Sequence, residues 1–456
     1  MSVPDIDKTI GMEVFATKTK GISGKIKGSV DDFTVEEVLV DGSAASVNHV
    51  PPSRVLGSTL QRQSYLLCIL VKRNWDTFVA VKNIAKSLGI DQTRVQFAGI
   101  KDAKAITAQH VSIENVSMED AQKIKVKDIQ VRTIGYIREK MSLFYLLGNN
   151  FTITIKNPNP PEVTVAEHIK QTINELGVQG GAPNFFGHQR FGTTRPITHL
   201  VGKAIVQGNF EQAGMLFLAK PSVHEHPASR QARQELETTK NFKTAKETFP
   251  KQLRFERQML NHLADNPGDF IAAFQRLPLK LQALFVQAHQ SYLFNRFLSE
   301  RVKNSLPLNE AVVGDFVVGV ERSGLPLTNV SKIVFAENLA EINAQIKAGR
   351  HRVALPIFGV KQKLSQGIMG QIENLVLEQE GIDAGNLRVN ELSRLGGRGG
   401  LRTIVAPIKN FKLQNVSPRQ EGEFGVTLSF MLLRGSYATV VLRELIKPLD
   451  PVSSGF

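Results

Sequence analysis

The sequence predicts an α+β fold divided into more than one domain, and three observations lead to this prediction. The chain has 456 residues, for which about two or three domains are expected. Hydrophobic residues make up 42% of it, which is enough for well-packed cores. Strand-like and helix-like patterns alternate through its first half, and antiparallel hairpins can join short strands of this kind.

The strand signals of the first half are short runs in which apolar residues alternate with polar ones or follow each other directly. They predict strands at residues 33–35, 66–71, 95–97, 111–113 and 151–155. A helix over 76–88 has apolar residues on one face, and Gly89 is placed to cap its C-terminus. A second helix over 165–176 is predicted to end at Gly177.

The middle of the chain has a different character. Residues 220–250 are polar, basic and poor in aliphatic side chains, so we expect an exposed excursion with little core of its own. Such a stretch could be a solvated face, or it could contact RNA. Residues 279–302 follow Pro278 with the apolar periodicity of an amphipathic helix, whose expected role is packing.

The last part of the chain begins with a glycine-arginine segment, residues 395–402. It could follow a phosphate backbone or act as a hinge between domains, and we favour the hinge. A predicted strand at 426–432 and a predicted helix at 438–445 follow it. These two elements could rejoin the first domain, so that both ends of the chain would build it.

The charge balance favours a polyanionic partner. There are 56 Lys and Arg against 42 Asp and Glu, a formal net charge of +14. Nucleic acid is the commonest partner of such a surface. Many basic enzymes bind no nucleic acid, so the charge alone does not decide the function.

The single cysteine excludes an internal disulfide and any zinc site built on paired thiolates. Cys68 lies in an apolar run typical of a buried strand, so we expect an inert thiol and a reducing compartment. The His224-Glu225-His226 sequence suggests a loop rather than a metal site, because no third ligand is indicated. The prediction is that the protein holds no metal.

No nucleotide-binding loop and no targeting segment are recognisable. The glycines of 177–181 follow a predicted helix rather than a strand, which is the wrong order for a dinucleotide-binding turn. No apolar run approaches the roughly 20 residues that a bilayer span requires. We therefore expect a cytoplasmic protein, without a cofactor and without a membrane partner.

The most informative feature is a carboxylate, Asp102, in a polar loop between two predicted strands. Lys101 precedes it, and a neighbouring ammonium favours an ionised carboxylate. Loops carried by a rigid scaffold often present functional residues. From spacing alone, the pair could equally be a solvated turn.

Three sequence motifs identify this loop by resemblance. Residues 99–109 match the pattern Gly-x-Lys-Asp-x-x-Ala-x-Thr-x-Gln, and residues 184–192 match Asn-x-Phe-Gly-x-Gln-Arg-Phe-Gly. Residues 435–445 are similar to a closing strand-helix segment, and weaker similarities occur at 32–37, 148–151 and 287–295. In this order along the chain, the motifs resemble those of the TruD family of tRNA pseudouridine synthases, closest to its archaeal and eukaryotic type.

The resemblance implies a pseudouridine synthase catalytic domain with a mainly antiparallel sheet, formed by residues 1–204 and 401–456. An α+β domain specific to the family would be inserted at residues 205–400. The implied activity is the isomerisation of uridine to pseudouridine in tRNA, at position 13, without a cofactor. The implied partner is tRNA, with other RNAs left open, and we expect a monomer.

The resemblance also implies roles for individual residues. Asp102 would be the catalytic aspartate, which either attacks the sugar or abstracts a proton to give a glycal. Phe186 would stack on the target base, and Asn184 would bind a uracil edge or the loop itself. A basic, an aromatic and an acidic residue near the active site would be Lys27, Phe33 and Glu37.

Other motif residues have supporting roles that stay open. Lys101 would orient the loop or meet a phosphate, and the side chains of Thr107 and Gln109 would brace the loop from behind. Gln189 and Arg190 would hydrogen-bond RNA or lock their own turn, with Arg190 the better phosphate ligand.

Two alternative functions were weighed. An RNA-modifying transferase, such as a methyltransferase, would need a glycine-rich donor loop or a well-placed thiol, and neither is found. A noncatalytic RNA-binding protein on the same scaffold is the other alternative, although the intact motifs at 99–109 and 184–192 do not favour a degenerate copy.

Overall fold

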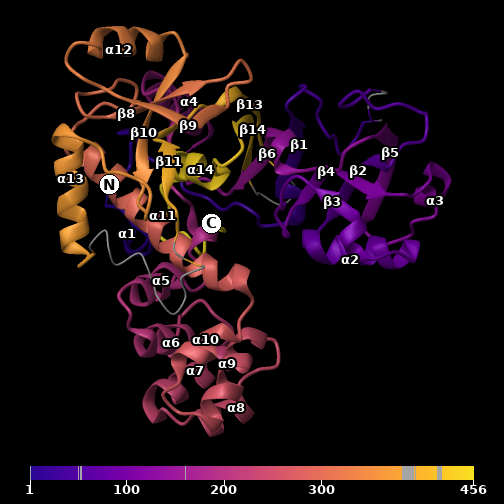
Figure 1. Cartoon of the computed structure of the whole chain (residues 1–456). Helices are drawn as coiled ribbons and strands as arrows, with labels where there is room; N and C mark the ends of the chain where they lie inside the picture. Colours follow the sequence, from indigo (N-terminus) through magenta and orange to yellow (C-terminus); the bar gives the residue numbers. More distant parts are fainter. Residues whose placement is uncertain are drawn as a thin grey trace.

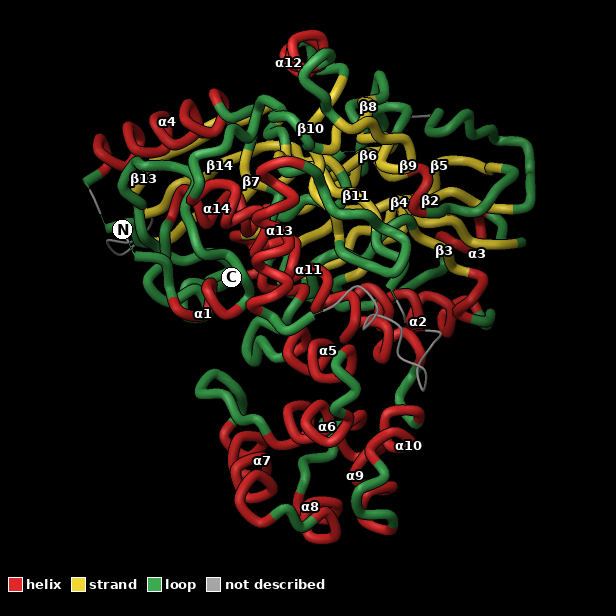
Figure 2. The backbone as a smooth tube through the Cα atoms, turned by 60° about the vertical axis from the view of Figure 1, so that its left-hand side comes forward, coloured by secondary structure: helices red, strands yellow, loops and turns green. Residues whose placement is uncertain are grey.

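The computed structural model describes residues 2–382 except 50, 52, 53 and 160, residue 395, residues 397–418 and residues 424–456. The chain forms a central body from which three lobes extend (Figure 1). One lobe carries β1 to β5, a second is made of helices α6 to α10, and the third holds β8 to β11 with α12 and α13. Figure 2 shows the helical lobe standing apart from the two sheet-containing parts.

The large sheet has eight strands in the order β13-β14-β6-β1-β4-β2-β5, with β3 paired to β4. Every pair in it is antiparallel except β1 with β4. The predicted α+β class and mainly antiparallel sheet are therefore confirmed. The strands span β1 Phe33–Leu39, β2 Tyr65–Arg73, β3 Val95–Phe97, β4 Ile106–Glu114, β5 Ile129–Ile137, β6 Leu146–Lys156, β13 Lys409–Pro418 and β14 Phe424–Leu433.

Both ends of the chain build this sheet, because β14 pairs with β6. Phe430 lies beside Phe151, and Phe151 lies beside Val35 of β1. Since side chains alternate along a strand, these three share one face of the sheet. Helix α14 (Ala438–Ile446) packs on that face in the same apolar cluster, as does α4 (Glu162–Val178).

The smaller sheets and the helices surround the large sheet. A four-stranded sheet has the order β11-β10-β8-β9, and β12 pairs with β7. These strands span β7 Ala182–Pro183, β8 Phe316–Val320, β9 Pro326–Ile333, β10 His351–Ile357, β11 Gly400–Thr403 and β12 Val405–Ala406. The other helices span α1 Asp5–Thr9, α2 Thr77–Leu88, α3 Met118–Gln122, α5 Thr198–Val206, α6 Phe210–Ala219, α7 Pro227–Thr239, α8 Phe242–Thr248, α9 Arg254–Asp265, α10 Phe270–Gln275, α11 Leu279–Lys303, α12 Leu339–Lys347 and α13 Gly367–Gln379.

The predicted helix ends are right for α2 and wrong for α4. Asp76 caps the start of α2 by accepting two backbone hydrogen bonds, and Gly89 ends it in the left-handed conformation. In α4 the chain stays helical through Gly177 as far as Val178, and the left-handed glycine comes later, at Gly180. A glycine near a helix end is not always its cap.

The prediction that residues 220–250 have little core is wrong. They form α7 and α8, and Leu236 and Phe249 are buried in the largest apolar cluster. Arg233 is also buried, with its guanidinium paired to Glu225 and Glu256 at 3.0 and 2.7 Å. The polar composition concealed these residues because the core of this lobe is built around an ion pair rather than aliphatic side chains alone.

The hinge interpretation of residues 395–402 receives no support from their packing; Gly396 lies outside the described residues. The backbone N–H of Val360 donates to the carbonyl of Gly397, and that of Lys361 donates to the carbonyl of Arg398. A Cβ at Gly359 would lie 2.3 Å from the backbone nitrogen of Gly399. Glycine is required there for the close approach of two backbones.

The predicted domain division, 1–204 and 401–456 around 205–400, cuts through two elements. Its first junction lies inside α5, which packs in one cluster with α11. Its second junction lies inside β11, which pairs with β10 of the inserted segment. We propose limits at 197/198 and 403/404 instead, because neither of these breaks a helix or a strand.

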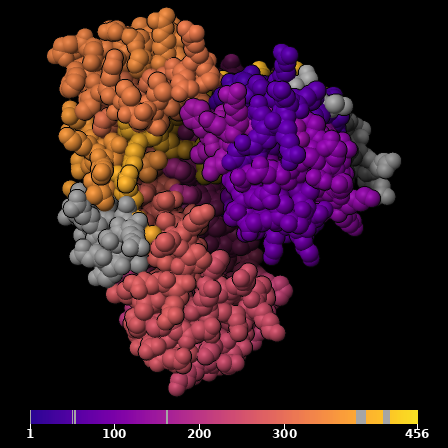
Figure 3. Space-filling view, turned by 45° about the vertical axis from the view of Figure 1, so that its right-hand side comes forward, coloured from indigo at the N-terminus to yellow at the C-terminus, as the bar shows by residue number. Residues whose placement is uncertain are grey.

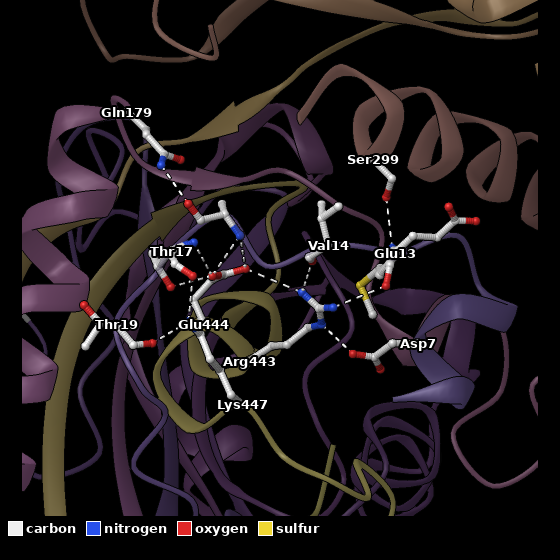
Figure 4. Close-up of polar contacts among 12 residues, drawn as sticks. Asp7, Glu13, Val14, Thr17, Thr19, Gln179, Ser299, Arg443, Glu444 and Lys447 are labelled. Atoms are coloured by element: carbon white, nitrogen blue, oxygen red, sulfur yellow. Dashed lines mark hydrogen bonds and ion pairs between the residues drawn. The ribbon is translucent and has the colours of Figure 1, made fainter. Parts of the chain in front are cut away.

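The N-terminal strap, which we define as residues 12–28, is fastened to α14 by buried charges (Figure 4). Glu444 accepts hydrogen bonds from the backbone N–H groups of Ala16 and Thr17 and from the Thr17 hydroxyl, at 2.8 to 3.1 Å. Arg443 donates to the carbonyls of Met12 and Val14, at 3.2 and 2.8 Å. The side chains of Arg443 and Glu444 are almost completely buried.

Two further contacts complete this network. Arg443 Nε lies 2.5 Å from Asp7 Oδ2, and His188 Nε2 lies 2.7 Å from Asp7 Oδ1. Burial alone would raise the pKa of Asp7, but the charge of Arg443 and the contact with His188 hold that pKa below its usual value. Lys447 donates to the carbonyls of Thr17 and Thr19, at 2.7 and 2.5 Å.

Two buried histidines lie around Tyr292 in the middle of α11. The rings of His199 and Tyr292 are stacked with centroids 5.0 Å apart, and those of His289 and Tyr292 are 6.2 Å apart. Burial lowers the pKa of His199 to about 4 and that of His289 to about 3. Both imidazoles are therefore neutral at physiological pH.

We predict that acid destabilises the protein through these histidines. The unfolded chain binds their protons near pH 6.5 and the folded chain does not, so stability is lost as pH falls below 6.5. By about pH 5 each histidine should cost about 2 kcal/mol relative to neutral pH. Urea unfolding followed by circular dichroism measures this loss.

His289→Phe keeps a ring in place but cannot titrate, so it should reduce the loss between neutral pH and pH 5. His49→Gln replaces an exposed histidine and should leave the loss unchanged. An equal acid sensitivity of wild type and His289→Phe would show that another group is responsible.

Candidate active site

Asp102 lies in the loop between β3 and β4, as predicted. Its side chain is 31% exposed, and its Oδ1 is 3.1 Å from Nζ of Lys27. The neighbouring residues of the loop, Ala103 and Lys104, are exposed. The loop therefore presents one paired carboxylate at the surface of the sheet.

Lys27 comes from the end of the N-terminal strap. It adopts a left-handed backbone conformation with φ of 55°, and its Nζ lies 4.6 Å from the centroid of the Phe33 ring. Phe33 is buried at the start of β1 and contacts Phe151 edge to face. Lys27 is thus held between an aromatic ring and the Asp102 carboxylate, which directs its ammonium toward the loop.

Lys72 fixes the main chain of the same loop from β2. Its ammonium donates to the carbonyl oxygens of Asp102 and Trp75, at 2.8 and 2.7 Å. Lys72 is fully buried, and burial lowers its pKa to about 8 despite the attraction of Asp102. A second lysine therefore contributes to the electrostatics of Asp102 without touching its carboxylate.

A buried ion pair lies beneath the loop. Glu37 of β1 is fully buried and its Oε1 is 2.8 Å from Nζ of Lys101, which is also buried. His110 donates its backbone N–H to Glu37 Oε2 at 2.8 Å, and its Nδ1 lies 3.2 Å from the same oxygen. Burial alone would raise the pKa of Glu37, but His110 and Lys101 hold that pKa below its usual value.

These contacts decide between the roles predicted for Lys101. A side chain that is buried and paired with Glu37 orients the loop and is not available to an RNA phosphate. The predicted acidic residue of the site, Glu37, is likewise behind the loop rather than open to a ligand. Both support the position of Asp102.

Hydrogen bonds to neighbouring elements complete the support of the loop. Gln109 Nε2 donates to the Gly99 carbonyl at 3.1 Å, as the bracing role requires. The Thr107 hydroxyl is buried and has no hydrogen-bond partner among the described residues, so it does not brace the loop as expected. Thr77, at the start of α2, takes that role instead: its Oγ1 accepts from the backbone N–H of Lys101 at 3.1 Å.

The second motif forms a tight corner in which Asn184 serves its own loop. Asn184 Nδ2 donates to the Thr403 carbonyl at 3.0 Å, and its Oδ1 accepts from Arg402 Nη2 at 2.7 Å. Arg402 Nε also donates to the Asn184 carbonyl at 2.9 Å. Asn184 is buried, so the contacts support the loop alternative of its two predicted roles.

Phe186 is 9% exposed, and aromatic and cationic groups surround its ring. Phe294 and Tyr437 contact it edge to face, at centroid distances of 5.6 and 6.3 Å. The Arg402 guanidinium carbon is 4.1 Å from the ring centroid. In the free protein, little of this ring is available to a base.

Helix α11 holds the same corner through residues of a weaker motif. Asn295 accepts from the backbone N–H of Phe186 at 2.8 Å and donates to its carbonyl at 3.0 Å. Arg190 Nε donates to Ser291 Oγ at 3.1 Å, which supports its turn-locking role. Gln189 is exposed and remains a candidate for contact with RNA.

The two motifs lie on one face of the large sheet. Glu37, Phe33 and Phe151 share the face on which α14 packs, and Tyr437, which contacts Phe186, immediately precedes α14. No hydrogen bond or ring contact links Asp102 with Asn184 or Phe186 among the described residues. The two groups therefore form neighbouring parts of one surface.

Other sequence predictions concern what the site does not use. Cys68 is buried in β2, and burial raises the pKa of its thiol. His224, Glu225 and His226 lie in the loop before α7, and in the described part of the chain no three acidic, His or Cys side chains gather as metal ligands do. Across the same residues, no helix combines the length and apolar character of a bilayer span.

Sequence reasoning missed Lys72, His110 and Arg402. Lys72 ends a run of buried apolar residues, which is a weak signal of a buried lysine. His110 is buried opposite Glu37 through pairing of β1 and β4, a pairing that no local pattern reveals. Arg402 was noticed only as part of a flexible segment.

Comparison with known proteins gives one consistent result. The family model described as tRNA pseudouridine synthase D (TruD) matches residues 9–445. A "Probable tRNA pseudouridine synthase D" of Methanosarcina mazei is 38% identical over 448 residues, covering 98% of both chains. One from Thermococcus sibiricus is 36% identical over 437 residues, covering 95% of this chain and 97% of its own. A crystal structure of a TruD protein from Methanosarcina mazei superposes with a TM-score of 0.83 at 36% identity, covering 99% of this chain and 100% of that one.

We predict that Glu37 and Lys101 stabilise the loop as a pair. Glu37→Gln leaves a buried ammonium without its counter-charge, and Lys101→Met leaves a buried carboxylate, so each should cost about 3 to 5 kcal/mol. The double variant should cost much less than the sum of the two. Native-state hydrogen exchange of the β1 and β4 amides measures the free energy of opening.

Lys104→Met, an exposed change in the same loop, is the control and should alter that free energy by less than about 0.5 kcal/mol. If the effects of the two buried changes are simply additive, the pair makes no mutual contribution.

Proposed function

The chain belongs to the TruD family of tRNA pseudouridine synthases, isomerases that convert uridine to pseudouridine in tRNA, and on this basis we propose that Asp102 is its catalytic aspartate. The observation that supports the assignment is the pairing of the partly exposed Asp102 carboxylate with Lys27 at 3.1 Å. The carboxylate lies in the first motif of the family and is held by a buried frame.

The reaction needs a carboxylate near the sugar. The bond between N1 of uracil and C1′ of ribose breaks, the base turns, and a bond between C5 and C1′ forms. C5 loses a proton and N1 gains one, so the atoms and charges balance within the nucleotide and no oxidant, reductant or second substrate is required. Asp102 would act at the ribose, either as a nucleophile at C1′ or as a base that gives a glycal.

Lys27 is the proposed positioning cation of the site. Its ammonium stabilises the negative charge on Asp102 and leaves the other carboxylate oxygen, Oδ2, available to the ribose. Phe33 and the strap restrict its movement. The loop frame of Lys101, Glu37 and Gln109 keeps Asp102 in place while RNA binds.

The corner of Asn184 and Phe186 is proposed to form the wall beside the target base, as the family motif implies. Asn184 would shape that wall through Arg402 rather than touch uracil. Arg402 covers the Phe186 ring, so a base that stacks there would displace the guanidinium or share the ring with it. Gln189 is the exposed polar side chain of this corner.

The proposed substrate is tRNA, with the target at position 13, in the cytoplasm and with the protein as a monomer. A stacked uridine cannot reach Asp102, so it must be extruded from the tRNA at a cost of a few kcal/mol. The excess of 56 basic over 42 acidic residues would offset this cost by attracting phosphates. Other RNAs that can present an unstacked uridine are also candidates.

We predict that Asp102→Asn lowers the single-turnover rate of pseudouridine formation in tRNA transcript by on the order of 10³-fold or more. Lys27→Met should lower it about a hundredfold, because it removes the charge beside the carboxylate. Both variants should bind tRNA nearly as well as wild type. Mapping of pseudouridine along the transcript gives the rate and the position together.

Lys104→Met removes an exposed charge from the same loop and should leave the rate within a fewfold of wild type. If Asp102→Asn forms pseudouridine at the wild-type rate, the assignment of the catalytic aspartate is wrong. If wild type modifies a position other than 13, only that part of the proposal fails.

A further inference from the structure

A second cavity lies beside the Asn184 corner, where the large sheet meets the four-stranded one. Its volume is about 180 Å³. The end of β14 and the turn before α14 form one wall, and segments of β9, β10 and β11 form the others. Figure 3 shows C-terminal residues, in yellow, in the hollow between the orange lobe and the indigo lobe.

Three arginines line this cavity, and each is held by carbonyl oxygens alone. Arg434 Nη1 donates to the carbonyls of Leu143 and Leu146, at 2.6 and 3.1 Å. Arg352 Nη1 donates to the Gly324 carbonyl at 3.0 Å, and Arg402 is bound to Asn184 as described above. These contacts fix three guanidinium groups around one small space.

No carboxylate balances these charges. The described residues that line the cavity include no Asp or Glu, and none of the three arginines has an ion pair with an acidic residue in the described part of the chain. All three side chains are half-buried. Burial lowers the pKa of Arg352, and it lowers that of Arg402 to about 10, as expected for cations without a counter-charge.

Uncompensated, half-buried charges cost free energy, so their grouping calls for an anion from outside the chain. The rest of the cavity suits an oxyanion. Thr328 and Ser436 contribute hydroxyl donors, and Gly435 and Ser436 directly precede α14, whose N-terminal end carries a partial positive charge. Guanidinium groups bind phosphate oxygens in a bidentate manner.

We propose that this cavity is a phosphate subsite, in which Arg434, Arg352 and the free Nη1 of Arg402 bind one backbone phosphodiester of the RNA substrate. Its volume of about 180 Å³ accommodates a phosphate group with part of its sugar but not a base stacked on a second base. The subsite would hold the strand next to the Asn184 corner.

This subsite deepens the proposed function and rests on it, because the anion is taken to be part of the tRNA that Asp102 modifies. Its position explains why Arg402 links two sites. One edge of its guanidinium holds Asn184, and the remaining nitrogen is turned toward no printed partner in the described residues. Binding of a phosphate would therefore also fix the wall beside the target base.

The test is a double-mutant cycle between protein and RNA, carried out on the full chain with Asp102→Asn so that no turnover occurs. One phosphate at a time around the target uridine is replaced by an uncharged methylphosphonate. At one linkage this change should weaken binding to the Arg434-containing protein about tenfold and to Arg434→Gln hardly at all. The slope of log K against log salt should fall by about 0.7 to 0.9 in Arg434→Gln.

Arg352→Gln is the second variant, since it loses one carbonyl contact and keeps the fold testable if Arg434→Gln does not fold. Arg230→Gln removes an exposed arginine from α7 and is the control, with additive effects expected at the same linkage. Additive effects at every linkage for Arg434→Gln and Arg352→Gln, or equal coupling for Arg230→Gln, would overturn the proposal.

The two proposals fail differently. If wild type forms no pseudouridine, the proposed function is wrong whatever the cycle shows. If wild type is active and the cycle is additive, the phosphate subsite alone is wrong. A cavity that binds inorganic phosphate in competition with no RNA linkage also counts against the subsite.

Discussion

The attachment of the N-terminal strap to α14 is the interaction on which the candidate active site depends. Glu444 binds the backbone of Ala16 and Thr17, and Ile22 and Ser23 continue the contact by hydrogen bonding to the last turn of the helix. A few residues later the same strap delivers Lys27 to Asp102. Because α14 is buried against the large sheet that carries the Asp102 loop, the two partners are referred to one rigid body. Loosening of the strap would separate them without disturbing either motif.

Buried charge is used in three places for placement rather than for net stability. Glu37 with Lys101 fixes the loop, Asp7 with Arg443 fixes the strap, and Arg233 with Glu256 organises the helical lobe. Each pair is costly to desolvate, and each becomes strongly destabilising when one partner is lost. Such pairs define one geometry, since a misplaced partner leaves an unpaired charge. At the cavity of Arg434 the pattern is reversed, because there the charges lack a partner within the described chain and are open to a ligand.

The sequence predicted the elements that have a local signal. The strands of the large sheet, the helix after Asp76 and the loop of Asp102 all follow from periodicity and turn residues. The partner of Asp102 did not, because Lys27 and Asp102 are brought together only by the pairing of β1 with β4 and by the path of the strap. The burial of Lys101 and Glu37 is equally nonlocal, since polar residues are normally expected at the surface. The core of residues 220–250 was missed for the same reason, with Arg233 as its centre.

The most direct test is the single-turnover rate of pseudouridine formation by Glu444→Gln, measured together with hydrogen exchange of the strap amides. Asp315→Asn is the matched control, because it removes an equally buried carboxylate, the partner of Arg301, far from the strap in sequence and outside its contacts. The account predicts that Glu444→Gln loses amide protection in the strap and at least about tenfold in rate, with tRNA affinity little changed, while Asp315→Asn keeps both protection and rate. Loss of strap protection in Glu444→Gln with a wild-type rate would contradict it.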